Sequence, residues 1–207
     1  MKQNPKKKSL LLEAKKFQTN LAKIKKETPI VCHTKSDKQL LDYIMQSFSF
    51  FGNNRPLPKG WVYAGQYDFI LKHGKFYKSQ ELTDAEKEIV TNALKNIGFK
   101  PRMKECFYNG QMLAMADETN QIKYCEGFGM SIIPMNHGWA TINDKVIDLT
   151  WKDDEGKNYF GEFDKSYLGF TIENDVIRKK QLATSMAASF LDDWQGGWEL
   201  FTKPFNK

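Results

Sequence analysis

Apolar residues recur at helical spacing near the start of the chain. Leu10, Ala14, Phe17, Leu21 and Ile24 follow one another at alternating intervals of four and three residues, which places them on one face of a helix. Lysines surround this stripe. The pattern predicts a basic amphipathic helix, which either packs its apolar face on the protein or contacts nucleic acid or another anionic surface.

Four more segments have a helical pattern, and capping residues mark the ends of two of them. Ser36 is a candidate N-cap for the first, while Thr83 and Glu86 have capping-box spacing at the start of the second, which Gly98 should stop. The sequence therefore predicts helices over residues 36–50, 83–98, 175–191 and from residue 106 onward.

Extended structure is predicted in two parts of the chain. Aromatic segments lie around a turn at His73 and Gly74, and later segments alternate around a hairpin turn at Asn143 and Asp144. Helices followed by antiparallel strands indicate an α+β fold. The expected extended segments are 61–71, 75–77, 122–133, 137–142 and 145–150, with a turn-rich loop at 52–60 and an aromatic tract over 159–172. We divide the chain into a basic helical extension, 1–55, and an α+β domain, 60–207.

Composition narrows the class of protein. The chain has 207 residues, of which 41% are hydrophobic, enough for one core. No stretch of about 18 apolar residues exists to span a membrane, and the apolar run at 10–12 is too short for a signal peptide. Three cysteines cannot all pair, which favours a reducing compartment. We expect a cytoplasmic protein, in the host cytoplasm if it is viral.

The net charge of +6 is concentrated at one end of the chain. Residues 1–26 contain nine lysines and one glutamate, a charge of +8, so the other 181 residues sum to −2. A polyanion contact is therefore expected only through residues 1–26.

Three residues between 105 and 151 suggest nucleophilic chemistry. Cys106 begins a predicted helix, where the partial positive charge stabilises a thiolate and the backbone N–H of the same residue can hold an oxyanion. His137 and Asp148 lie on two strands joined by a tight turn, so the carboxylate can orient the imidazole. Together they form a candidate nucleophile, base and orienting group.

Nearby side chains are candidates for supporting roles. Asn109 and Gln111 follow the cysteine by about one turn, and their amides can hold a loop or contact a substrate. Glu126 can face the cleft or anchor the helix that bears the cysteine. Trp139 and Trp151 are expected in the core rather than as a platform for substrate, and Trp139 is a candidate supporting residue.

The remaining cysteines are expected to be structural. Cys32 precedes a helix and Cys125 lies in a predicted strand. His33 adjoins Cys32, but no second pair of ligands has zinc spacing, so no metal site is predicted.

The motifs in this region resemble the transglutaminase-like branch of the papain-like cysteine peptidase superfamily, and more narrowly a group of phage and bacterial proteins. The resemblance covers about residues 100–172. Gly110 and Gly138 depart from the common pattern without affecting the three candidate residues. The motifs are C-F-Y-N-G at 106–110, Y-C-E-G at 124–127, H-G-W at 137–139, V-I-D-L-T-W at 146–151 and Y-L-G-F at 167–170.

The resemblance implies a helix bearing Cys106 packed on an antiparallel sheet, and attack of a thiolate on an amide or ester through an acyl-enzyme, without a cofactor. The expected function is acyl transfer or amide hydrolysis on a protein or peptide substrate. Arylamine acetyltransferases share the order of the three residues but usually have longer chains. The alternative is a phage-type binding module without activity, whose basic N-terminal helix contacts nucleic acid or a host protein.

Overall fold

The computed structural model describes residues 5–52, 56–96, 98, 100–151, 165–194 and 196–205, with the backbone alone for residues 5–11. The helices are α1 (Pro5–Glu27), α2 (Lys35–Phe51), α3 (Gln66–His73), α4 (Asp84–Asn96), α5 (Cys106–Ala116), α6 (Asn174–Thr184) and α7 (Glu199–Thr202). The strands are β1 (Lys75–Tyr77), β2 (Lys123–Met130), β3 (Pro134–Ile142), β4 (Lys145–Ile147) and β5 (Ser166–Ile172). Parts of two predicted segments, 53–55 and 159–164, lie outside the described residues.

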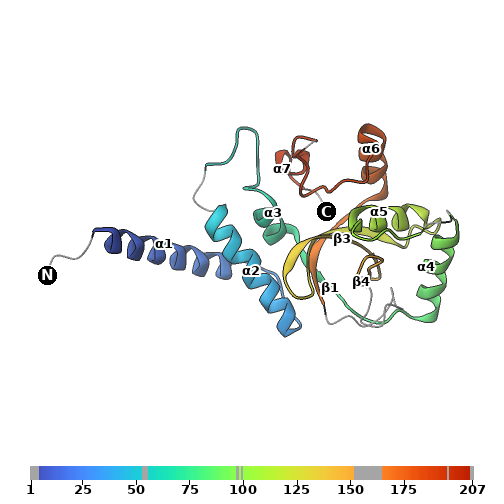
Figure 1. The fold of residues 1–207 in the computed structure, drawn as a ribbon, viewed down its shortest axis with the longest axis horizontal. Coiled ribbons are helices and arrows are strands. Elements are labelled where there is room, and N and C mark those ends of the chain that lie inside the picture. Colours follow the sequence, from blue (N-terminus) through green and yellow to red (C-terminus); the bar gives the residue numbers. More distant parts are fainter. Residues whose placement is uncertain are drawn as a thin grey trace.

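The five strands form one curled antiparallel sheet, a half-barrel, in the order β1-β5-β2-β3-β4. Its register places His137 opposite Gly127, which pairs in turn with Gly169 of β5. The fold is therefore α+β, as the sequence predicts. Figure 1 shows α5 lying along the sheet, with α4 beside it and α6 and α7 beyond it.

Helices α2, α3 and α5 pack on the sheet through one continuous core. Leu40 and Ile44 from α2, Phe69 from α3 and Leu113 from α5 are all completely buried in it. A second cluster, formed by Tyr77, Cys125, Trp139, Val146 and Tyr167, lies on the other side of the strands. Helix α2 contributes to the same main core as α3 and α5. The predicted boundary between an N-terminal extension and an α+β domain stays a prediction.

Helix α1 is helical as predicted and projects from the body of the protein (Figure 1). Its C-terminal half packs on α2: Ile24 is buried, and the Ser49 hydroxyl donates to the backbone carbonyl of Phe17. The apolar stripe therefore docks on the protein over this half. Among the described residues no helix combines the length and apolar character needed to cross a membrane.

Several local predictions are confirmed. Thr83 and Glu86 form the capping box, since the backbone N–H of each donates to the side chain of the other. Asn143 and Asp144 both adopt positive φ, which is the backbone of a two-residue hairpin turn. Helix α4 ends before Gly98, which also has positive φ.

Other predictions are wrong. Residues 66–71, expected to be extended, belong to α3, because Phe69 and Ile70 are buried against other elements and Asp68 pairs with Lys72 one turn on. The N-cap of α2 is Thr34 rather than Ser36, and its capping box closes on Asp37. Helix α6 ends at Thr184 rather than at residue 191.

Strand ends also differ from the prediction. The expected segment 122–133 stops at β2's Met130, and β3 begins three residues earlier than expected, at Pro134. Strand β4 ends at Ile147, so that Asp148 begins an irregular turn.

Candidate functional site

Cys106 is the first residue of α5, as the sequence predicts. Glu105, at the N-cap position, makes no capping hydrogen bond through its side chain. The N-terminus of α5 lies tightly against the sheet: a Cβ atom on Gly138 would lie 3.1 Å from the Cα of Phe107. A Cβ on Gly110 would likewise lie 3.0 Å from the Trp139 backbone. Both glycines therefore allow the cysteine-bearing helix to approach β3.

His137 and Asp148 form a buried pair. The Nε2 atom of His137 lies 2.7 Å from Oδ2 of Asp148, and the two side chains are 2% and 0% exposed. Since Asp148 engages Nε2, Nδ1 is the ring nitrogen available to Cys106.

The electrostatics link the same ring to Cys106. Burial disfavours the charged ring, but attraction to the Asp148 carboxylate and hydrogen bonding to Asp148 and Cys106 outweigh it and raise the pKa of His137 to about 9. Burial also opposes the charge of Asp148, yet His137 and two backbone N–H groups lower the pKa of that carboxyl. The three candidate residues are thus brought together, with an imidazolium at neutral pH.

Asp148 is held by more partners than the sequence suggested. Its Oδ1 accepts from the backbone N–H groups of Thr150, at 2.8 Å, and Trp151, at 3.0 Å. Its Oδ2, which binds His137, also accepts from the hydroxyl of Tyr167 at 2.9 Å. The carboxylate is therefore fixed on both oxygens, and Tyr167 is a positioning residue that sequence analysis missed.

Two tryptophans enclose the imidazole. Trp151 stacks on the His137 ring, with centroids 3.9 Å apart and planes 10° apart. Trp139 is completely buried in the second cluster, with its ring 6.3 Å from that of His137. Trp139 lies in the core as expected, whereas Trp151, also expected only in the core, contacts the candidate base directly.

Asn109 joins the loops on either side of the candidate site. Its side-chain amide donates to the carbonyl of Arg102 and to the hydroxyl of Thr150, and its Oδ1 accepts from the N–H of Arg102, all at 2.8 Å. It is buried, so its role is to hold the loop before Cys106 against the loop after Asp148. Gln111 likewise donates to the carbonyl of Ala188.

Glu126 lies in the sheet and holds the C-terminal segment. Its carboxylate accepts from the backbone N–H groups of Phe190 and Leu191 and from the hydroxyls of Tyr124 and Ser189. Burial raises the pKa of Glu126, although these hydrogen bonds act in the opposite direction. It anchors residues 189–191 rather than the helix that bears Cys106.

The other two cysteines have surroundings that disfavour a thiolate. Cys125 is completely buried, and burial raises its pKa to about 12. Burial, together with Asp37 and Asp42, also raises the pKa of Cys32. Over the described ranges, no three or more His, Cys, Asp or Glu side chains are grouped so that they could hold a metal ion.

Two pockets flank the candidate site. The first, of about 740 Å³, is lined by residues of three loops, 101–103, 131–133 and 149–151, together with Met135 of β3 and Lys165. The second, of about 750 Å³, lies between α5 and α6 and is lined by Glu105, Tyr108 and Met112 among others. We call them the 132 pocket and the 182 pocket, after Ile132 and Leu182.

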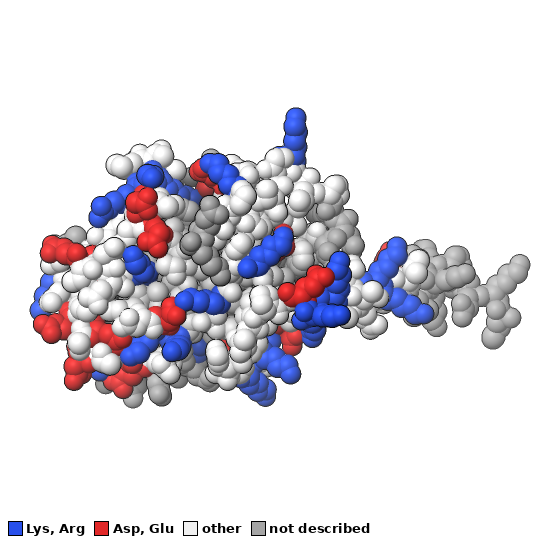
Figure 2. All heavy atoms as spheres, turned by 180° about the vertical axis from the view of Figure 1, so that it is seen from behind, with Lys and Arg blue, Asp and Glu red and all other residues white. Residues whose placement is uncertain are grey.

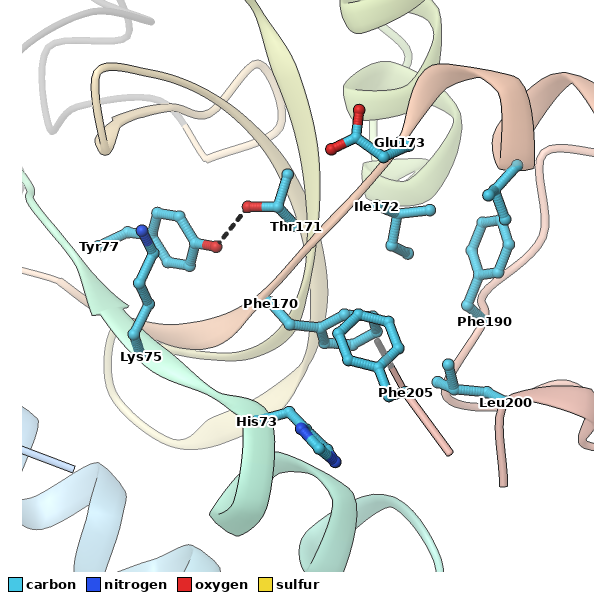
Figure 3. A pocket seen from close by; sticks show the side chains of 11 residues that line it. His73, Lys75, Tyr77, Phe170, Thr171, Ile172, Glu173, Phe190, Leu200 and Phe205 are labelled. Carbon is cyan, nitrogen blue, oxygen red and sulfur yellow. Dashed lines mark hydrogen bonds between the residues drawn. The ribbon is translucent and has the colours of Figure 1, made fainter. Parts of the chain in front are cut away.

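A further pocket of about 370 Å³ lies elsewhere, along the end of β5, between β1 and the C-terminal segment (Figure 3). Phe170, Phe190 and Phe205 form its apolar part, and the Tyr77 and Thr171 hydroxyls are hydrogen-bonded at its edge. None of the three candidate residues lines it.

Comparison with known proteins adds no family: no protein-family model, no curated protein and no solved structure matches the chain.

Proposed function

We propose that the protein carries out thiol-dependent acyl transfer or amide hydrolysis, with Cys106 as nucleophile, His137 as proton donor and acceptor, and Asp148 as the orienting group. The observation that carries the proposal is the buried His137–Asp148 pair, whose ring also interacts with Cys106. Packing of α5 on a curled antiparallel sheet is compatible with a transglutaminase-like or papain-like core.

The proposed reaction has two stages. The Cys106 thiolate attacks the substrate carbonyl, and the N–H groups of the first turn of α5, which lack a side-chain cap, stabilise the oxyanion. The His137 imidazolium protonates the leaving group as the bond to it breaks. In the second stage, water or another nucleophile attacks the carbonyl carbon of the acyl-enzyme and gives its proton to His137. The bond to sulfur then breaks, which releases the Cys106 thiolate.

The protonation state of His137 favours this assignment. With a pKa of about 9, the ring is charged at neutral pH and attracts a thiolate beside it. A charged ring acts as a proton donor to the leaving group, which differs from a neutral histidine that first takes a proton from the thiol. The Asp148 carboxylate makes that charged ring possible at a buried position.

The proposal is tested by the rate of Cys106 alkylation with iodoacetamide near pH 6, read by peptide mass. We expect His137→Ala to slow this labelling about tenfold or more, because the charged partner of the thiolate is removed. Cys32 is the internal comparison, since it is partly exposed and distant from His137 along the chain.

Cys125 is a poor comparison because it is buried and would resist labelling in any case. An unchanged Cys106 rate in a His137→Ala protein that melts normally would show that the imidazole does not activate the thiol. The enzyme proposal would then fail.

A second candidate function, binding of a polyanion by α1, rests on a separate observation. Lys15, Lys16, Lys23 and Lys26 are exposed on this projecting helix, whereas Lys25 pairs with Asp42 at 2.9 Å. Basic side chains gather around the end of the body from which α1 projects (Figure 2). Such a surface suits the phosphate backbone of a nucleic acid.

This second candidate needs charge substitutions rather than a truncation, because Ile24 belongs to the core. We expect Lys15→Gln, Lys16→Gln and Lys23→Gln together to weaken salt-sensitive binding of a DNA duplex, by about tenfold or more at low salt, without lowering the melting temperature. A variant that binds as the parent does would exclude α1 as the contact.

A further inference from the structure

The 132 pocket is built from the loops adjoining all three members of the proposed triad. Pro101–Met103 precede Cys106, residues 131–135 precede His137, and residues 149–151 follow Asp148. Asn109 fixes the first loop to the third through Arg102 and Thr150. The pocket is therefore held in position relative to the reacting groups.

Several apolar side chains that line the 132 pocket are exposed to solvent. Ile132 is 92% exposed and Met103 is 85% exposed, and Ile133 and Met135 are also exposed. Single exposed hydrophobic residues are ordinary, but several around one hollow indicate a binding surface. The Arg102 guanidinium, which also borders the pocket, is already engaged by Glu105 at 3.2 Å and lies over the Tyr108 ring.

The pocket lies on the histidine side of the site. Trp151, one of its lining residues, is the side chain stacked on the His137 ring. The 182 pocket, by contrast, takes its lining from the segment 102–112 and from residues 178–187, with no residue from the loops next to His137 or Asp148. The two pockets thus differ in their relation to the proton donor.

Reaction chemistry assigns the histidine side to the leaving group. The imidazolium must reach the atom that departs from the carbonyl carbon, so whatever is attached to that atom extends past His137. We propose that the 132 pocket binds a bulky apolar group on the leaving-group side of the scissile bond. This inference rests on the proposed function and specifies its substrate class: amides or esters whose departing amine, alcohol or thiol carries an aromatic or branched aliphatic group.

The test uses two thioesters with the same acetyl group, S-benzyl thioacetate and S-(2-hydroxyethyl) thioacetate, whose departing thiols have similar acidity. In each case the Cys106 thiolate attacks the carbonyl, the bond from that carbon to the departing sulfur breaks, and His137 gives its proton to the departing thiolate. The acetyl group remains on Cys106, and intact mass with peptide mapping measures the rate.

We expect the benzyl thioester to acetylate Cys106 about tenfold faster, since partial burial of a phenyl ring at about 25 cal/mol per Å² readily supplies the 1.4 kcal/mol that a tenfold ratio requires. Ile132→Ser and Met103→Ser together should bring the ratio close to one by slowing the benzyl thioester only. Both residues are so exposed that the fold should not change.

Leu182→Ser is the matched control, because Leu182 is also 85% exposed and lines the 182 pocket. It should leave the ratio unchanged. Equal rates for the two thioesters in the parent protein, or a ratio lowered by Leu182→Ser but not by the Ile132 and Met103 changes, would overturn the inference while Cys106 acetylation still stood. Absence of acetylation by either thioester would instead overturn the proposed function, and this inference with it.

Discussion

Two carboxylates lie fully buried near the cysteine-bearing helix, and their surroundings shift their acidity in opposite directions. Asp148 has an imidazole 2.7 Å away in addition to neutral donors, and its pKa is lowered. Glu126 accepts from four neutral hydroxyl and backbone donors, and burial raises its pKa. Two carboxyl groups that are equally buried therefore have pKa values shifted in opposite directions, because their partners differ.

The two carboxylates therefore have different roles: Asp148 stabilises a charged side chain, and Glu126 holds a segment of the backbone in place. Asp148 holds a cation in place, so its removal should change the reactivity of Cys106 through His137. Glu126 holds the segment 189–191 through its backbone N–H groups, so its removal should change stability instead. Four predictions test this division, beginning with the largest effect.

Asp148→Asn should reduce the alkylation rate of Cys106 at pH 6 to 7 by a factor on the order of ten to a thousand. The amide keeps the volume but lacks the charge, so burial is left to favour the neutral His137 ring. Peptide-mass kinetics measure the rate, and thermal melts show whether the variant is folded. A folded variant with the parent rate would reduce Asp148 to a structural residue of the turn.

Glu126→Gln should lower the free energy of unfolding by about 2–3 kcal/mol, because an amide oxygen replaces a carboxylate that accepts from several donors. Urea denaturation at neutral pH measures the loss. In the folded fraction, the iodoacetamide rate of Cys106 should stay within about threefold of the parent rate. A large loss of reactivity without loss of stability would place Glu126 in the proposed chemistry and abolish the contrast with Asp148.

The free energy of unfolding should depend on pH through His137, Asp148 and Glu126. His137 has a raised pKa, so the stability it contributes is present below about pH 6.5 and is lost as pH rises through about 9. Asp148 has a lowered pKa, so its contribution is present above about pH 4 and is lost as pH falls through its folded value. Glu126, with a raised pKa, acts oppositely to Asp148 in acid.

Melting temperatures across pH 3 to 10 measure these trends. Asp148→Asn should flatten the loss on the acid side and also the loss near pH 9, since both arise from one pair. Glu126→Gln should make the acid loss steeper, because it removes a group that favours the folded state as pH falls. If both variants change the acid side in the same direction, the assignment of opposite shifts is wrong.

The sequence was sufficient to predict the features that depend on a few neighbouring residues. The Thr83–Glu86 capping box and the Asn143-Asp144 turn each depend on a few adjacent residues, so spacing alone identifies them. Helix α3 could not be found in this way, because its eight residues gain stability from burial of Phe69 and Ile70 against other elements. The helical conformation of this segment therefore depends on tertiary packing rather than on its local sequence.

The same distinction applies to the candidate site. Alternation along β3 and the turn to β4 suggested that His137 and Asp148 meet, because both belong to one hairpin. Tyr167 comes from β5, and only the sheet register brings it to Asp148. Trp151 was visible in the motif that contains Asp148, but its stacking on His137 depends on the path of the turn.

The smallest predicted effect belongs to Tyr167→Phe. The variant keeps the aromatic ring in the second cluster and removes only the hydroxyl that donates to Oδ2 of Asp148. Loss of one such charge-assisted hydrogen bond should cost about 1–2 kcal/mol of stability. The carboxylate then has His137 as its main partner on that oxygen, so the pKa of His137, followed by NMR of the ring protons, should rise slightly rather than fall. Cys106 reactivity at pH 6 should change by less than about tenfold, since the imidazolium persists. A fall in the His137 pKa toward 6.5 would mean that Tyr167, rather than the charge of Asp148 alone, maintains the protonated ring, and the contrast with Glu126 would then depend on hydroxyl donors as much as on the cation.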